Sequence, residues 1–491
     1  MPVKIALNEL INVLAGDVVY CSSPEDICAE GITPDSREVK DGGIFLARRG
    51  ETDDGHKYIV KALTAGASII IAERAWLEAN NTDEFKTLAR QNGYAIVGVN
   101  DSTLALGDLA RYWRNKLNPK TIAITGSVGK STTKEILASL LEQLVGQGTA
   151  NKKSYNNMVG LPMTVLEASV GDKWLLLEAG MNHAGELEYL TSIAQPDCAT
   201  ILNVEAVHLE FFRSLAAIAD AKCELLRGLR ANGQVILRQD NVELFAGVAR
   251  EEARQGKEFK KVFFGLSEQA QYRVKSIESR GLDGERFSLS GLRDESYETS
   301  IPHLGLHNIV NACAAVATLQ TAYPEIELGD IAQALPQSRK AGMRLEIKKL
   351  RDKQFIIDCY NANPLSMLSA FEIVKNIAQK QKFALILGDM RELGEASKEY
   401  HVELGKNAAA VDPDYIMVIG EQAEYVAAGA CSMGYERITV AQSMAQIAEQ
   451  VLASADVPLV LFKASRGIKL ETAVKLIEEK LDAIPFSVPT S

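Results

Sequence analysis

Long hydrophobic runs are absent from this sequence of 491 residues. No apolar stretch approaches the roughly 18 residues that a membrane-spanning helix needs. The N-terminal stretch MPVKIALNELINVLAGD is too acidic and polar for a secretory signal. We therefore expect a cytoplasmic protein with no membrane insertion.

Paired cysteines and an excess of basic charge are also missing. The seven cysteines are an odd number, are scattered along the chain and form no Cys-x-x-Cys pair, which argues against a disulfide framework and a structural zinc site. Fifty-three Lys and Arg residues stand against 64 Asp and Glu residues, giving a net charge of −11. General attraction to a phosphate backbone is thus disfavoured, and we expect no nucleic-acid partner. An anionic ligand would need a local site made of backbone N–H groups, a few basic side chains or a metal ion.

The length and the alternation of strand-like and helix-like segments predict three α/β domains. A typical domain of roughly 100–200 residues gives about three for this chain. Proline-containing breaks near Asn118 and Gln337 divide it into residues 1–118, 119–336 and 337–491.

Each domain is expected to contain a sheet covered by helices. The first reads as a small α/β domain, the second as a P-loop ATPase-like domain with a parallel sheet, and the third as a Rossmann-like, doubly wound domain. The expected strands are 43–47 and 67–72 in the first domain, 121–125, 174–178, 199–204 and 234–237 in the second, and 355–358, 383–387, 415–419 and 458–462 in the third.

The strongest local signal is a phosphate-binding loop. It stands after the strand-like run 121–125 and before the helical run 133–144. Glycines in such a loop let backbone N–H groups turn toward phosphate oxygens, and the helix N-terminus adds partial positive charge. Lys130 would reach the β- and γ-phosphates and Ser131 would bind Mg²⁺. Ile124 stands where the generic pattern has its first glycine, but the strand–loop–helix context is kept. We predict an ATP site formed by Thr125, Gly126, Ser127, Val128, Gly129, Lys130, Ser131 and Thr132.

Two candidate metal-site residues follow neighbouring strand-like runs. Glu178 ends the run 174–178, at the sheet edge where a P-loop enzyme needs an acid to hold the metal. His208 follows the run 199–204, where ligands bind in open α/β sheets. Each has an ordinary alternative, because many strands end in an acid and a lone histidine is more often a structural hydrogen-bonder.

Together these motifs resemble the Mur ligases, ATP-dependent enzymes that join amino acids or peptides to a UDP-linked peptidoglycan precursor. The resemblance covers nearly the whole chain. In the first domain, Asp35-Ser36-Arg37 and Asp54-Gly55-His56 look like the family's uridine-nucleotide-binding domain, and the loop at 125–131 is similar to the family's own P-loop variant. The strings 360–364 (Tyr-Asn-Ala-Asn-Pro) and 388–394 (Gly-Asp-Met-Arg-Glu-Leu-Gly) resemble the branch that adds D-alanyl-D-alanine.

The resemblance implies a carboxylate–amine ligase that forms a peptide bond. ATP would phosphorylate the terminal carboxylate of UDP-N-acetylmuramoyl tripeptide, and the amine of D-alanyl-D-alanine would attack the acyl phosphate, with release of ADP and phosphate. The pentapeptide product would serve peptidoglycan synthesis, and so cell wall biogenesis, cell shape and cell division. Two magnesium ions would neutralise charge in the phosphoryl transfer. We expect a monomer whose partners are these two small-molecule substrates.

The same resemblance assigns roles to individual residues. Ser131 and Glu178 would hold one magnesium and His208 would assist the second, while Lys222 falls where the family has a carbamylated lysine. The expected catalytic residues are Lys130, Glu178, His208 and Lys222. Asn308, Arg344 and Asp358 would bind ATP beside the loop, although by spacing alone Asn308 is only a helix N-cap. The expected substrate-binding residues are Ser36, Arg37, Asn156, Asn157, Tyr360, Asn361 and Lys463.

One departure and several rival functions remain. Ala464 stands where the family's Lys-Gly-Ser-Arg motif has glycine, and its methyl group would alter the turn slightly. A diaminopimelate- or lysine-adding ligase should have an Asp-Asn-Pro-Arg string, which is absent. A related ligase of a cofactor pathway should have lost the uridine-binding features, and a folate-polyglutamating ligase normally lacks the first domain. A regulatory NTPase or an inactive binding protein is disfavoured because the candidate metal and phosphate ligands are all retained.

Overall fold

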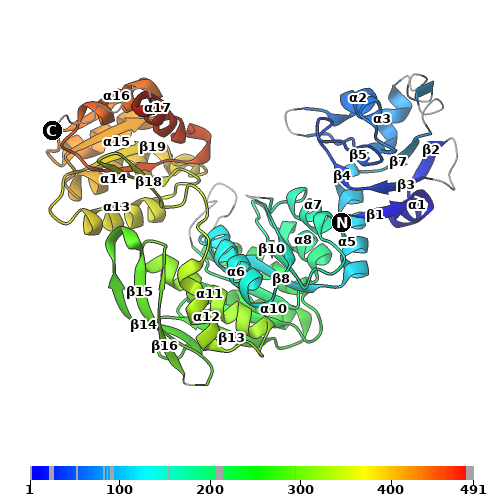
Figure 1. The fold of residues 1–491 in the computed structure, drawn as a ribbon, viewed down its shortest axis with the longest axis horizontal. Helices are drawn as coiled ribbons and strands as arrows, with labels where there is room; N and C mark the ends of the chain where they lie inside the picture. The colour runs from blue at the N-terminus through cyan, green and yellow to red at the C-terminus, as the bar shows by residue number, and fades with distance from the viewer. Residues whose placement is uncertain are drawn as a thin grey trace, which may run out of the picture. The chain divides into compact units, whose positions relative to one another are not determined.

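The protein has an α/β fold, as the sequence predicts (Figure 1). The computed structural model describes residues 3–21, 27–50, 53–80, 83, 85, 87–88, 93–152, 155–205, 212, 214–293 and 295–482. Its internal contacts divide the chain into two compact units. The first comprises residues 1–204, 216–272 and 314–331, and the second comprises residues 205–215, 273–313 and 332–491. The predicted bounds of three domains stay a prediction.

The first unit begins with a small sheet of order β2-β7-β6-β5-β4. Strands β4 to β7 are parallel and β2 is antiparallel to β7, while a separate antiparallel pair is formed by β1 and β3. The two strands predicted in this region are β5 and β6, whose residues Phe45 and Ile70 are buried. The elements are β1 (Lys4–Ala6), α1 (Leu7–Leu14), β2 (Asp17–Cys21), β3 (Cys28–Glu30), β4 (Ile32–Thr33), β5 (Ile44–Leu46), η1 (Gly55–Tyr58), α2 (Ile59–Thr64), β6 (Ile69–Glu73), α3 (Arg74–Ala79), β7 (Ala95–Val99) and α5 (Ser102–Leu117).

The first unit continues with six parallel strands in the order β13-β12-β11-β8-β10-β9. All four runs predicted here are strands of this sheet, and every residue of β10 is buried because helices cover both faces. Strand β11 ends at Ile201, earlier than predicted, because Asn203 turns to the phosphate loop. The elements are β8 (Lys120–Thr125), α6 (Lys130–Leu144), β9 (Gly148–Ala150), α7 (Gly160–Glu167), β10 (Trp174–Glu178), α8 (Glu186–Ala194), β11 (Cys198–Ile201), α9 (Leu215–Cys223), η2 (Glu224–Gly228), β12 (Gln234–Arg238), α10 (Val242–Gln255) and β13 (Lys260–Gly265).

Strand order places the phosphate loop at a switch point of this sheet. Strand β8 lies between β10 and β11, so its following loop is flanked by the carboxyl ends of both neighbours. Ligands bind at such points in open parallel sheets. The loop, Glu178 and Asn203 thus share one edge of the sheet.

Three antiparallel strands were not predicted from the sequence. They are β14 (Tyr272–Ser279), β15 (Glu285–Ser290) and β16 (Ser296–Ile301), followed by α11 (Leu306–Ala322), α12 (Leu328–Ala334) and η4 (Leu335–Gln337), with η3 (Gly281–Asp283) between the first two strands. Their signal is the period-2 alternation of β15, in which Phe287 and Leu289 are buried and Arg286 is exposed. A search for continuous apolar runs misses this pattern.

The second unit ends in a six-stranded sheet of order β17-β18-β22-β19-β20-β21, parallel except for β17. All four strands predicted in this region are present. The elements are β17 (Glu346–Leu350), β18 (Lys353–Asp358), α13 (Pro364–Ala378), β19 (Phe383–Gly388), η5 (Gly394–Ala396), α14 (Ser397–Ala410), β20 (Tyr415–Ile419), α15 (Ala423–Ser432), β21 (Ile438–Val440), α16 (Met444–Ala453), β22 (Leu459–Lys463), η6 (Arg466–Ile468) and α17 (Glu471–Asp482).

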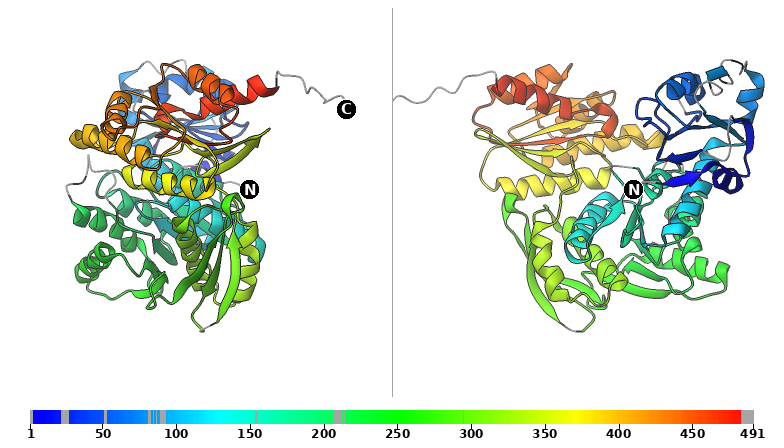
Figure 2. Two further views of the ribbon diagram at one scale, coloured as in Figure 1. Left: turned by 90° about the vertical axis from the view of Figure 1, so that its left-hand side faces the viewer. Right: turned by 45° about the vertical axis from the view of Figure 1, so that its right-hand side comes forward.

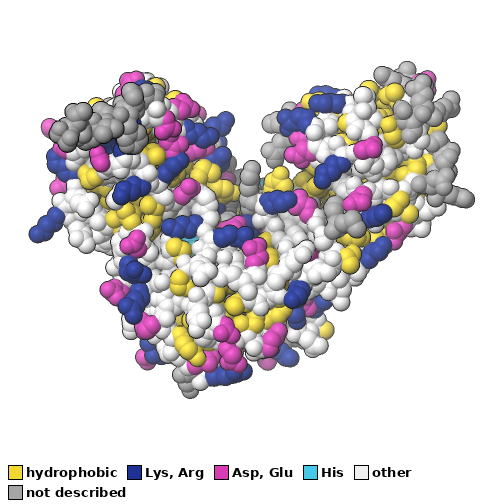
Figure 3. Space-filling view, in the orientation of Figure 1, with side chains coloured by type: hydrophobic (Ala, Val, Ile, Leu, Met, Phe, Trp, Pro, Cys, Tyr) yellow, Lys and Arg dark blue, Asp and Glu magenta, His cyan; other side chains and the backbone are white. Residues whose placement is uncertain are grey.

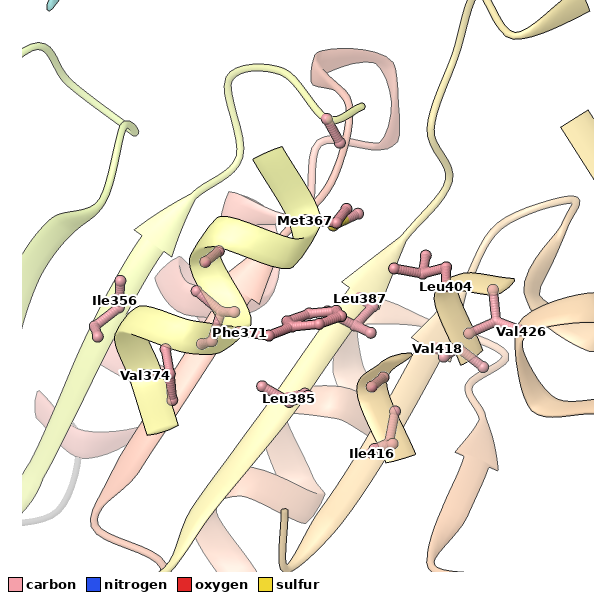
Figure 4. Close-up of a cluster of buried hydrophobic side chains, with 14 of the residues drawn as sticks. Ile356, Met367, Phe371, Val374, Leu385, Leu387, Leu404, Ile416, Val418 and Val426 are labelled. Atoms are coloured by element: carbon pink, nitrogen blue, oxygen red, sulfur yellow. The ribbon is translucent and has the colours of Figure 1, made fainter. Parts of the chain in front are cut away.

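Helices cover both faces of this last sheet (Figure 2). Alternate residues of β19 face opposite layers: Leu385 and Leu387 belong to the core with Phe371 of α13, as Figure 4 shows, whereas Ile386 belongs to the core with α16 and α17. This is the doubly wound arrangement that the sequence predicts.

On the face drawn in Figure 3, Lys and Arg side chains are interspersed with Asp and Glu side chains, so positive charge on that face is local. Among the described helices, none is both long and apolar enough to cross a membrane.

Helix α5 attaches the N-terminal sheet to the central sheet within the first unit. It packs on α7 and α8, and the fully buried Arg114 donates from Nε to the carbonyl oxygen of Ala194 (2.8 Å) and from Nη2 to that of Gln195 (2.5 Å). These carbonyls end α8 and have no partner inside the helix, so the guanidinium caps it. Burial, followed by the charge of Arg230, lowers the pKa of Arg114 to about 10.

We predict that Arg114→Met lowers the free energy of unfolding by about 1–3 kcal/mol, because the carbonyl oxygens of Ala194 and Gln195 lose their donor. The measurement is guanidinium chloride unfolding followed by tryptophan fluorescence, since Trp113 is buried next to the substitution. Arg111→Met is the matched control: Arg111 also lies on α5 and contacts α8 through Ser192, but its side chain is 36% exposed. Equal losses in the two variants would contradict the capping role.

Candidate active site

The phosphate loop, residues 126–129, is shaped by two glycines and one asparagine. Gly129 has φ +86°, a left-handed conformation that favours glycine, and a Cβ on Gly126 would lie 2.9 Å from the Cβ of Leu202. The backbone N–H of Ser127 donates to the carbonyl oxygen of Asn203 (3.1 Å), that of Val128 donates to Oδ1 of Asn203 (3.0 Å), and Nδ2 of Asn203 donates to the carbonyl oxygen of Val128 (3.1 Å). Asn203 therefore fixes the loop from the end of β11.

The loop's lysine lies over the loop itself. Nζ of Lys130 donates to the carbonyl oxygens of Gly126 (2.6 Å) and Ser127 (3.2 Å). Helix α6 begins at this lysine, and its N-cap is Gly129, which has no side chain to cap the helix. A helix N-terminus beside an ammonium group is suited to bind phosphate. Ile124, the departure from the generic pattern, is a fully buried residue of β8.

Glu178 lies beside the loop with one carboxylate oxygen unsatisfied. It pairs with Ile124 across the β10–β8 ladder and is 1% exposed. Its Oε1 accepts a hydrogen bond from Nδ2 of Asn156 (2.7 Å), whereas its Oε2 is buried without a hydrogen-bond partner among the described residues. Burying a carboxylate oxygen without a partner costs free energy, and a bound cation would offset that cost.

These residues fit a magnesium ion. Magnesium in nucleotide sites is usually held by one or two carboxylates or hydroxyls together with substrate phosphates, rather than by a cage of protein ligands. Glu178 supplies the carboxylate, and Ser131 supplies a hydroxyl in the first turn of α6. Within the described ranges, no group of three or more His, Cys, Asp or Glu residues is placed to hold a metal. His208, the other predicted metal-site residue, lies outside the described residues.

Lys222 is a buried lysine in the last turn of α9. Its side chain is 1% exposed, and it forms no hydrogen bond or ion pair with the part of the chain that the structure describes. Burial, followed by the charge of Lys130, holds the pKa of the Lys222 ammonium well below its usual range. The Lys222 side chain therefore lies near the phosphate loop in surroundings that disfavour its charged form.

A pocket of about 1190 Å³ joins the N-terminal sheet to the region after Glu178. Both Ser36 and Arg37 line it, as does Asn157, whereas Asn156 is not among its lining residues. Two further basic residues, Arg48 and Lys61, were not predicted. The lining residues are Pro34, Asp35, Ser36, Arg37, Arg48, Gly50, Asp53, Gly55, Tyr58, Lys61, Asp101, Thr103, Asn157, Met158, Val159, Gly180, Asn182, Glu186 and Leu190.

Arg37 is held by its neighbour Asp35. Its Nε donates to both carboxylate oxygens of Asp35 (2.9 and 3.1 Å) and its Nη2 donates to Oδ2 (2.5 Å). Hydrogen bonds from Arg37 lower the pKa of Asp35 to about 2, so the pair stays ionised at neutral pH. The guanidinium is 76% exposed and is therefore oriented but still open to an anionic ligand.

Two motif residues have structural partners. His56 is buried, with Nδ1 bonded to Oδ1 of Asp54 (2.7 Å) and Nε2 accepting from the backbone N–H of Glu73 (3.1 Å). Asn157 accepts from the backbone N–H groups of Val159 and Gly160 and so caps the start of α7. The buried His56 therefore stabilises the Asp54-Gly55-His56 motif through hydrogen bonds on both ring nitrogens. Asn157 also lines the pocket.

The second unit gathers five predicted residues at the carboxyl edge of its sheet. Lys463, 1% exposed, donates to the carboxylate of Asp358, its partner in the β18–β22 ladder, and to the carbonyl oxygen of Asn361 (3.4 Å). The guanidinium of Arg344 lies 4.2 Å from the ring centre of Tyr360, a cation–π contact. Asp358, Tyr360, Asn361, Arg344 and Lys463 thus form one cluster.

The interpretation of Asn308 as an N-cap is wrong. Helix α11 begins at Leu306, so Asn308 lies inside the first turn. Its Nδ2 donates to the carbonyl oxygen of Leu304 (2.8 Å) and its Oδ1 accepts from Nδ2 of Asn311 (3.1 Å). The start of the helix was misplaced because Gly305, at φ +86°, provides the turn that asparagine was expected to provide.

Ala464 is accommodated by a glycine on the neighbouring strand. Its side chain is fully buried, and a Cβ on Gly388 would lie 2.8 Å from the Cβ of Ala464. The methyl group occupies the space that Gly388 leaves, which keeps Lys463 and Ser465 in place. Ser465 still accepts from the backbone N–H of Arg391 (3.0 Å).

Comparisons with known proteins match all three regions. The model described as Mur ligase middle domain matches residues 124–319, the Mur ligase, glutamate ligase domain matches residues 343–466, and the Mur ligase family, catalytic domain matches residues 29–114. The chain is 32% identical to the UDP-N-acetylmuramoyl-tripeptide–D-alanyl-D-alanine ligase of Bacillus subtilis, over 93% of this chain and 95% of that protein.

Two solved structures are similar over nearly their full length. MurF from Acinetobacter baumannii is 30% identical, with a TM-score of 0.85, and the match covers 97% of this chain and 99% of that one. The MurF ligase from Thermotoga maritima in complex with ADP is 27% identical, with a TM-score of 0.75, and the match covers 92% and 98% of the two chains.

Proposed function

This chain belongs to the Mur ligase family, and from that premise we propose that it joins D-alanyl-D-alanine to UDP-N-acetylmuramoyl tripeptide at the expense of ATP. The product is the pentapeptide precursor of peptidoglycan. The observation that carries the proposal is a match over nearly the full length to a UDP-N-acetylmuramoyl-tripeptide–D-alanyl-D-alanine ligase. It is combined with a phosphate loop whose lysine lies in the same unit as the buried carboxylate Glu178.

The reaction requires activation of a carboxylate, which is a poor electrophile at neutral pH. A carboxylate oxygen of the tripeptide attacks the γ-phosphorus of ATP, so that a new P–O bond forms as the bond to ADP breaks. The amine nitrogen of the dipeptide then attacks the acyl carbon, the C–O bond to phosphate breaks and the nitrogen loses a proton. ADP, phosphate and a peptide bond result.

The protein's contribution to the first step is charge and position. Lys130 and the N–H groups at the start of α6 bind the phosphates, while Asn203 holds the loop in shape. Ser131 and Glu178 would hold magnesium, which when bound neutralises charge on the phosphate oxygens. The cluster of Arg344, Asp358, Tyr360, Asn361 and Lys463 would serve the nucleotide and the incoming dipeptide.

The pocket of the first unit suits the UDP-linked acceptor. Its N-terminal side carries Arg37, Arg48 and Lys61, which can neutralise a diphosphate, and its other side reaches Gly180, two residues after Glu178. An extended ligand can therefore have its anionic end on the N-terminal sheet and its peptide end toward the metal ligand.

Several finer expectations are part of the same proposal. We propose two magnesium ions, with His208 and a carbamylated Lys222 at the second, and we propose a monomer that acts in the cytoplasm, where both nucleotide substrates are made. The three matched ranges, 29–114, 124–319 and 343–466, each fall inside one of the domains proposed at 1–118, 119–336 and 337–491.

We predict phosphate release that depends on UDP-N-acetylmuramoyl tripeptide and D-alanyl-D-alanine together. The measurement is a phosphate-release assay with the product mass determined alongside. A mixture in which free lysine, diaminopimelate or glutamate replaces the dipeptide is the control and should release no phosphate above background. Turnover with a free amino acid and none with the dipeptide would refute the proposal in favour of another ligase of the superfamily.

We predict that Lys130→Ala lowers the rate of phosphate release by at least roughly 100-fold, because a charged donor to the transferring phosphoryl group is lost. Calorimetric affinity for UDP-tripeptide should stay close to the unmodified value, since the pocket lining does not include Lys130. Lys120→Ala, at the exposed other end of β8, is the control and should be active. Lost UDP-tripeptide binding in the Lys130 variant alone would contradict the assignment of the pocket.

We predict that Lys222 carries a carbamate. Its amine is buried in surroundings that disfavour the ammonium form, and in its neutral form it can attack carbon dioxide, forming an N–C bond and releasing one proton. Carbon NMR of protein equilibrated with labelled bicarbonate should show one carbamate signal that disappears in Lys222→Met and persists in Lys353→Met. A spectrum without that signal in the unmodified protein at neutral pH would rule the modification out.

A further inference from the structure

One asparagine, Asn151, forms hydrogen bonds with the backbone of Glu178, and it was not among the residues predicted from the sequence. The N–H of Glu178 donates to Oδ1 of Asn151 (2.5 Å), and Nδ2 of Asn151 donates to the carbonyl oxygen of Glu178 (3.3 Å) and to that of Tyr155 (2.5 Å). Asn151 follows β9, the strand next to β10, and is 3% exposed. One amide side chain therefore satisfies both backbone groups of the residue that carries the unpaired carboxylate.

A buried lysine in turn holds Asn151. Nζ of Lys134 donates to the carbonyl oxygen of Asn151 (2.7 Å) and is 2.9 Å from Oε1 of Glu135. Lys134 is 1% exposed and lies one turn after Lys130 on α6. Burying an ammonium group costs free energy unless the group is paired and hydrogen-bonded. The partners of Lys134 are therefore the groups that it holds in place. One of these contacts is to Asn151, beside Glu178, and another is to Glu135 on the same helix.

The same short segment also holds the carboxylate. Asn156, five residues after Asn151, donates from Nδ2 to Oε1 of Glu178, and its carbonyl oxygen accepts from the N–H of Gly180 (2.8 Å). Gly160 packs against Tyr155 so closely that a Cβ there would lie 2.4 Å from the Cα of Tyr155. Asn151 and Asn156 are thus bonded to groups on both sides of the Glu178 side chain.

We propose that Lys134 and Asn151 are positioning residues that aim the free oxygen of Glu178 at the metal site. The bonds from Asn151 fix the backbone of Glu178, the bond from Asn156 fixes one carboxylate oxygen, and Oε2 is left in a single orientation. Groups that orient a metal ligand typically affect metal affinity or activity by about 10–100-fold. The inference rests on the proposed metal role of Glu178 and extends it to residues that contact neither phosphate nor metal.

The test uses the full chain with Lys134→Met and Asn151→Ala. Manganese is the probe, titrated with a non-hydrolysable ATP analogue and followed by electron paramagnetic resonance. Manganese affinity is expected to fall by about 10–100-fold in both variants, whereas UDP-tripeptide affinity is unchanged. Lys134→Arg keeps a donor for the carbonyl oxygen of Asn151 and is expected to restore most of the affinity.

A second readout requires no ligand. Hydrogen exchange of the segment 174–182 in the free protein should be faster in Lys134→Met and Asn151→Ala, because the amide of Glu178 loses protection. Lys353→Met is the matched control: Lys353 is also buried and donates to two carbonyl oxygens, of Ser454 (2.7 Å) and Val457 (2.9 Å), but in the C-terminal sheet. It is expected to lose stability with no change in manganese affinity or in exchange at 174–182.

The outcomes separate the two levels of the proposal. Manganese affinity and exchange at 174–182 that match the unmodified protein in both variants would overturn the positioning role, and so would an equal loss of manganese affinity in Lys353→Met. Glu178→Gln tests the level beneath: manganese affinity unchanged in that variant would overturn the metal role of Glu178 itself, whatever the exchange data show. Should Asn151→Ala fail to fold, Lys134→Met and Lys134→Arg still decide the matter.

Discussion

The unpaired carboxylate oxygen of Glu178 is the constraint on which the central site depends. A buried carboxylate is tolerated only where positive charge or hydrogen bonds meet it. Here one oxygen has Asn156 and the other has no partner in the described part of the chain. The parallel sheet sets this arrangement, because β10 ends beside β8 and therefore brings Glu178 next to the phosphate loop. A cation bound at the loop would satisfy this carboxylate oxygen as well as the phosphates of the substrate.

The positive groups available to anionic ligands in this acidic chain are concentrated at two local sites. The net charge of −11 gives no general attraction to phosphate. Lys130 and the start of α6 supply one local positive site, and Arg37, Arg48 and Lys61 supply another in the pocket of the first unit. Asp35 orients Arg37 but leaves its side chain largely exposed, so Arg37 can still bind an anionic ligand. Specific recognition thus coexists with an acidic surface.

The sequence was most informative where one local signal determines the structure. Buried apolar runs such as 174–178 and 415–419 are strands with the predicted bounds, because continuous apolar stretches of this length are typical of parallel sheets. The antiparallel strand β15 was missed because four of its six residues are polar. The start of helix α11 was placed at Asn308 because the turn made by Gly305 was not recognised. Hydrogen-bond partners distant in sequence were not predicted. Nothing in the sequence around Asn203 or Asn151 shows that the first bonds to the phosphate loop and the second to the backbone of Glu178. Asn203 does stand just after a strand, at the edge of the sheet where ligands bind, and this position is a signal that could have identified it.

The buried lysines show why Lys222 differs from the others. Lys134 and Lys353 donate to backbone carbonyl oxygens, and Lys463 pairs with Asp358, so each has an acceptor for its protons. Lys222 is equally buried and has no such acceptor among the described residues, while Lys130 adds repulsion. A cation in that position is unfavourable, and a neutral amine leaves a polar group unused. The proposed addition of carbon dioxide would resolve both problems, because it would replace the cation with an anion that Lys130 and a metal ion would stabilise. Burial makes an unmodified ammonium group costly at this position, and the proposed carbamate would instead place a negative charge near Lys130.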